Sequence, residues 1–149
     1  MTGQPNEVKR VRVEGLQVDP ALTPLDPTLQ GLMQEAFEGR VPLYRAEVPL
    51  ALCVPGDPDC RPDLHPAGIA AIRLTIENWR NKRFAYLLVY PRGVWFVVSD
   101  DYPQLFAYLS VQADYVPCWV LGKPDNPLVK NVQGPIRHDD VRRILTGAA

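Results

Sequence analysis

The chain has 149 residues, of which 46% are hydrophobic, 22% charged and 9% aromatic, a composition that excludes wholesale disorder. Its 16 Lys and Arg residues nearly balance 17 Asp and Glu residues, and a net charge of -1 provides no basic field that would gather nucleic acid. The length corresponds to about one domain, so we expect a single domain over residues 1–149.

The first expected elements lie before residue 39. Residues 1–7 are polar and expected to be flexible, and valines interleaved with basic residues over 8–13 predict a short edge strand. A proline-rich stretch then separates this strand from a helix predicted over 27–38. Pro27 suits the first turn of that helix, and Gly39 suits its end.

The next part of the chain alternates apolar runs with prolines. Apolar residues at 46–53 predict one strand, and four prolines within residues 55–66 predict a rigid surface loop. Apolar side chains at helical spacing then predict a helix over 66–80.

Two short runs rich in valine and aromatic residues, 84–90 and 94–99, are separated by Pro-Arg-Gly. This spacing predicts a β-hairpin. Both runs are apolar on both faces, which is typical of strands covered on each side. We therefore expect the hairpin at the centre of a sheet.

The remaining elements are expected to be short. The pattern predicts a helix over 103–111, a strand over 115–121, a loop over 122–134 and a last helix ending at Gly147. Together the elements predict an α+β fold in which a small mixed sheet with a central hairpin is flanked by three to four short helices.

Several features indicate the compartment. The longest apolar run, residues 84–90, is far shorter than the roughly 20 residues that span a bilayer. No apolar stretch follows the basic residues near the N-terminus, so no secretory signal is expected. Three cysteines are an odd number, which argues against a disulfide framework. We expect a cytoplasmic protein that does not cross a membrane.

The boundary between the predicted hairpin and the helix after it resembles a family motif. Residues 97–108 read VVSDDYPQLFAY, and Val116 and Pro117 open the next strand. In the ParB/sulfiredoxin-like superfamily a strand ending in Val-x-Asp-Gly-x-His-Arg-x-x-Ala precedes a helix and a strand opening Val-Pro. The order of elements over residues 48–121 also resembles the core of that domain. The resemblance implies a ParB/sulfiredoxin-like fold over about half of the chain.

The chain departs from this motif at three positions. Asp101, Pro103 and Gln104 stand where the family has the glycine, histidine and arginine that help to hold a nucleotide phosphate. A second carboxylate repels phosphate, proline removes an N–H donor, and glutamine lacks the charged fork of arginine. We therefore expect no nucleotide and no cofactor at this turn. The candidate ligand turn comprises Ser99, Asp100, Asp101, Tyr102 and Gln104.

The two carboxylates of this turn also permit another hypothesis. Asp100 and Asp101 could recruit a divalent cation, as in a divergent metal-dependent nucleotide hydrolase or nuclease of the same superfamily. The simpler interpretation is that they cap the following helix. The serines and histidines have no triad-like spacing and no glycine-rich phosphate loop occurs, so we assign no catalytic residues.

A second group of residues has the chemistry of zinc ligands. Cys53, Asp57, Asp59, Cys60 and His65 lie close together in the sequence. Their spacing matches no familiar zinc site, so we expect a proline-stiffened loop and no metal. A small zinc protein that uses the two cysteines and the histidine stays a third hypothesis.

Basic residues gather around the end of the predicted 66–80 helix. This candidate basic face consists of Arg73, Arg80, Lys82 and Arg83. With the neighbouring Trp79 it could hold single-stranded nucleic acid by charge and stacking, but a solvated helix face is the simpler interpretation. We expect nucleic-acid binding to be weak and without sequence preference.

The sequence as a whole favours binding over catalysis. We expect a non-enzymatic binding or accessory domain on a degenerate ParB/sulfiredoxin-like fold, with a protein partner favoured over DNA. The sequence leaves the identity of the partner and the oligomeric state open.

Overall fold

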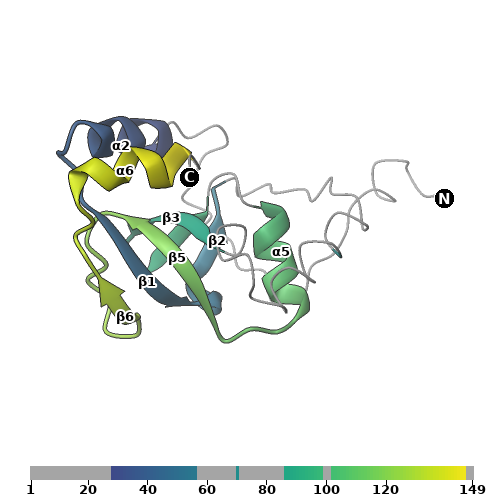
Figure 1. Ribbon diagram of the computed structural model, residues 1–149. Helices are drawn as coiled ribbons and strands as arrows, with labels where there is room; N and C mark the ends of the chain where they lie inside the picture. Colours follow the sequence, from purple (N-terminus) through teal and green to yellow (C-terminus); the bar gives the residue numbers. More distant parts are fainter. Residues whose placement is uncertain (1–27, 57–69, 71–85, 99–101, 147–149) are drawn as a thin grey trace.

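A computed structural model describes residues 28–56, 70, 86–98 and 102–146 (Figure 1). The described residues form three α-helices and a six-stranded sheet, which confirms the predicted small α+β fold. The helices are α2 (Thr28–Phe37), α5 (Tyr102–Ser110) and α6 (His138–Thr146). The strands are β1 (Leu43–Pro49), β2 (Cys53–Pro55), β3 (Leu87–Arg92), β4 (Trp95–Val98), β5 (Tyr115–Leu121) and β6 (Lys130–Gln133).

The sheet is mixed and has the strand order β2-β4-β3-β5-β1-β6. The pairs β3–β4, β1–β5 and β1–β6 are antiparallel, whereas β2–β4 and β3–β5 are parallel. Each strand of the β3–β4 hairpin therefore has a neighbour on both sides. This confirms the prediction that the hairpin is internal to the sheet.

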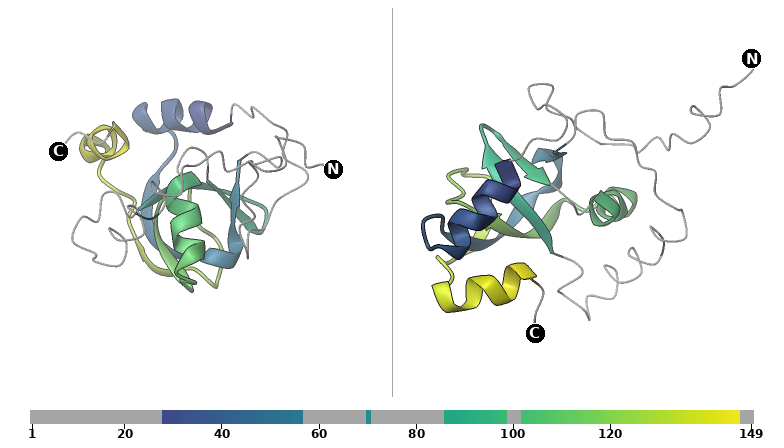
Figure 2. Two further views of the ribbon diagram at one scale, coloured as in Figure 1. Left: turned by 90° about the vertical axis from the view of Figure 1, so that its right-hand side faces the viewer. Right: turned by 90° about the horizontal axis from the view of Figure 1, so that it is seen from above.

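Side chains alternate between the two faces of the sheet, and each face has its own helical cover. On one face α5 packs Leu105 and Phe106 among buried residues such as Val98 and Val120. On the other face Leu43, Val97 and Leu121 pack with Ala36 of α2 and Val141 of α6. The views in Figure 2 show the same arrangement, with α5 on the side of the sheet opposite to α2 and α6. The two faces are called here the α5 face and the α2/α6 face.

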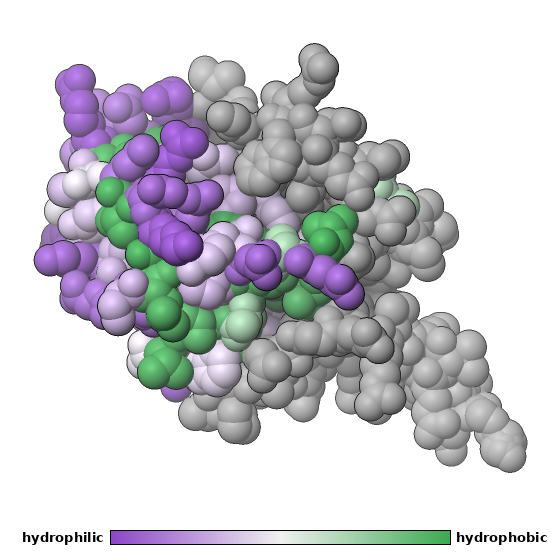
Figure 3. Space-filling view, turned by 90° about the horizontal axis from the view of Figure 1, so that it is seen from below, coloured by the Kyte–Doolittle hydropathy of each residue, from purple (hydrophilic) through white to green (hydrophobic). Residues whose placement is uncertain are grey.

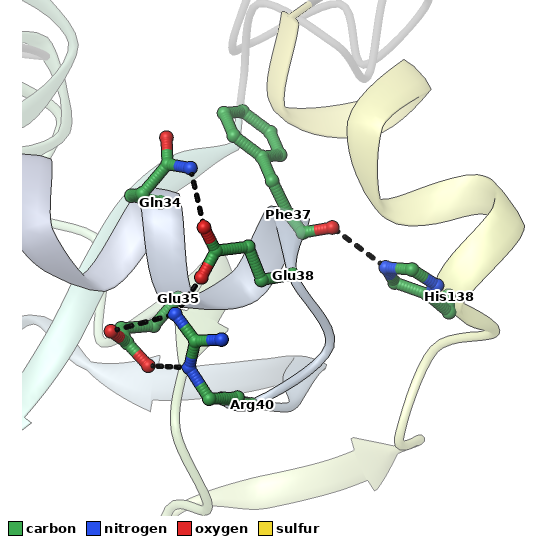
Figure 4. Close-up of polar contacts among 6 residues, drawn as sticks. All are labelled: Gln34, Glu35, Phe37, Glu38, Arg40 and His138. Atoms are coloured by element: carbon green, nitrogen blue, oxygen red, sulfur yellow. Dashed lines mark hydrogen bonds and ion pairs between the residues drawn. The ribbon is translucent and has the colours of Figure 1, made fainter.

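Polar contacts join the two helices of the α2/α6 face (Figure 4). The ring of His138 at the start of α6 lies with Nε2 2.7 Å from the carbonyl oxygen of Phe37, at the end of α2. Arg142 places its guanidinium 4.5 Å from the centre of the Phe37 ring. After α2, Arg40 bridges the carboxylates of Glu35 and Glu38. The contacts of His138 and Arg142 with Phe37 join α6 to α2, whereas the Arg40 bridge stabilises the end of α2 itself.

Several elements agree with the sequence patterns. The helix expected over 27–38 is α2, the helix expected over 103–111 is α5, and the strand expected over 115–121 is β5. The edge strand expected over 8–13 and the helix expected over 66–80 lie outside the described residues, apart from the helical Ala70.

Three predictions of local structure are wrong. The hairpin turn expected at residues 91–93 lies at Gly93 and Val94, because β3 continues through Pro91 and Arg92 to pair with β4. The strand expected over 46–53 is divided, because β1 ends at Pro49 and a short 3-10 helix (Leu50–Leu52) carries the chain to β2. β1 and β2 lie in different parts of the sheet, with three strands between them. The loop expected over 122–134 contains β6, whose polar sequence KNVQ lacks an apolar alternation and forms a strand by pairing with β1.

None of the helices among the described residues is long and apolar enough to cross a membrane.

Candidate functional site

The turn proposed to bind a ligand lies between β4 and α5. β4 ends at Val98 and α5 begins at Tyr102, which places the turn at the end of an internal strand, as the sequence pattern indicated. Ser99, Asp100 and Asp101 are outside the described residues. Gln104 is half-buried in the first turn of α5. The positions of the Asp100 and Asp101 carboxylates are therefore outside the part of the chain that the structure describes.

The residues considered for zinc are only partly described. Cys53 is buried in β2, with Sγ 3.7 Å from the carbonyl oxygen of Pro49. Asp57, Asp59, Cys60 and His65 lie outside the described residues. Where the structure describes side chains, it brings together no group of three or more histidine, cysteine or acidic residues. Cys53 lies among apolar side chains of the α5 face, a position typical of a structural thiol.

The candidate basic face of Arg73, Arg80, Lys82 and Arg83 also lies outside the described residues, together with Trp79.

Aromatic and cationic side chains meet on the α2/α6 face. The Arg45 guanidinium lies 5.0 Å from the centre of the Tyr86 ring, which stacks on Trp119 at 5.2 Å between centroids and 29° between planes. Beside them the Lys130 ammonium lies 4.4 Å from the centre of the Tyr115 ring. These contacts contribute stability because a cation is attracted to the face of an aromatic ring. No sequence signal could have identified them, since the residues come from four separate segments.

The end of the sheet at β6 exposes apolar side chains. All four residues of β6 are exposed, and Val132 of this strand and Leu128 just before it expose 46% and 55% of their surface. Val129 lies between them in the sequence and packs against the core of the α5 face. Seen from below, the molecule has a band of hydrophobic surface among hydrophilic areas (Figure 3). Residues 128–133 are called here the β6 surface.

The pairing of β6 with β1 contains a β-bulge. Lys130 is opposite Glu47 and Gln133 is opposite Arg45, so Asn131 and Val132 together face the single residue Ala46. Asn131 has a φ of 54°, and its side-chain amide donates a hydrogen bond to the Glu47 carboxylate. The positive φ of Asn131 and its hydrogen bond to Glu47 therefore stabilise the bulge. Lys130 is placed on the α2/α6 face, where it is opposite Glu47 and its ammonium lies over the Tyr115 ring.

Tyr108 is a buried titratable group of the α5 face. Burial raises the pKa of its hydroxyl well above the usual range, and Cys118 and Tyr86 add to this effect. The hydroxyl is therefore neutral at physiological pH, and we assign it to the core.

Comparison with models of known protein families gives no match for this chain, and neither does comparison with curated proteins.

Proposed function

We propose that this chain is a non-enzymatic binding or accessory domain, on a ParB/sulfiredoxin-like scaffold, that engages a protein partner at the β6 surface. The observation that carries the proposal is the exposure of Leu128 and Val132 at the last described strand of the sheet. Apolar side chains that stay exposed near the end strand of a sheet are available for contact with a protein partner.

The apolar surface that a partner could cover on Leu128 and Val132 is large enough to affect the affinity of binding. Leu128 and Val132 expose 55% and 46% of their surface, so a partner that covered both would bury about half of each side chain. Full burial of such a side chain contributes about 1.5–3 kcal/mol, and covering both exposed halves therefore contributes about 2 kcal/mol. This free energy corresponds to roughly a thirtyfold increase in affinity.

The charge of the β6 surface favours protein over nucleic acid. Residues 128–133 contain one cation, Lys130, which lies over the Tyr115 ring. Nucleic-acid affinity depends on several cations that neutralise phosphates together. A protein partner instead needs apolar groups and available backbone hydrogen-bonding groups, and the end strand of a sheet can supply both.

The proposal is tested by selecting peptides from a random phage-displayed library on the immobilised full-length protein. Dissociation constants are then measured for the double variant Leu128→Asp/Val132→Asp and for Val94→Asp. Val94 is the matched control because it exposes 62% of its surface in the β3–β4 turn, away from β6. We expect the selected peptides to bind the parent and the control equally, and to bind the double variant at least about tenfold more weakly.

Circular dichroism and thermal unfolding show whether each variant is folded, and because all three positions are exposed we expect their midpoints to stay close to that of the parent. Failure to select any binding peptide would contradict the proposal. Equal binding of the selected peptides to the parent and to a folded double variant would also contradict it.

A further inference from the structure

We draw no further inference here: the strongest candidate, the cluster of aromatic and cationic side chains around Trp119 and Tyr115 on the α2/α6 face, carries nothing, because its two cations already lie over rings of the cluster itself and nothing among the described residues shows what covers it.

Discussion

The packing of α5 on the sheet can be measured by shortening Phe106 to alanine. Phe106 is 2% exposed and lies among the buried side chains of the α5 face. A buried phenylalanine removes about 200 Å² from water, which at about 25 cal/mol per Å² amounts to about 5 kcal/mol. Partial collapse of the cavity and the better helix propensity of alanine reduce this cost. We expect Phe106→Ala to lower the free energy of unfolding by about 3–5 kcal/mol.

The assay is urea unfolding of the full-length chain, followed by tryptophan fluorescence and far-ultraviolet circular dichroism. Gln104→Ala is the matched control, because Gln104 is half-buried on the same helix and its replacement should cost less than about 1 kcal/mol. Phe106→Leu, with an expected cost of about 1–2 kcal/mol, keeps the measurement possible if the alanine variant does not fold. A cost below about 1 kcal/mol for Phe106→Ala would refute the assignment of α5 to the core.

Three further predictions concern other parts of the chain. Gly134 has a φ of 136°, and an added Cβ would lie 3.0 Å from the Tyr44 ring, so Gly134→Ala should lower the free energy of unfolding in urea by about 1–3 kcal/mol. The control is Gly31→Ala within α2, where an added Cβ would have nothing within 4 Å, and this substitution should raise the free energy of unfolding by up to about 1 kcal/mol. Because burial raises the pKa of Tyr108 above its unfolded value, its contribution to stability should be complete below about pH 10 and should diminish at higher pH, and Tyr108→Phe should weaken this dependence in unfolding measurements. Calorimetric titration with ATP, CTP or GTP should show no binding in the presence of chelator; binding that requires magnesium or manganese and is lost in Asp100→Asn would favour the hydrolase hypothesis instead.

Local sequence patterns were sufficient for much of the fold. The helix α2 carries its signals within itself, since leucine, methionine and phenylalanine recur at helical spacing and Gly39 follows with a φ of 80°. The β3–β4 hairpin is similarly local, because two strongly apolar runs are joined by a short turn. These elements depend on interactions between residues close in the chain, and such interactions can be read from the sequence.

Tertiary structure alone decided the end of the sheet and hence the proposed binding surface. The four residues KNVQ have no pattern of a strand, and they become β6 because Arg45 and Glu47 of β1 provide a partner far away in the sequence. The contact of Arg45 with Tyr86, and of Tyr86 with Trp119, likewise joins segments that only the sheet brings together. The sequence by itself therefore determined which segments are helical or apolar. The pairing of strands determined which apolar side chains stay exposed, because exposure depends on neighbours that the local pattern does not contain.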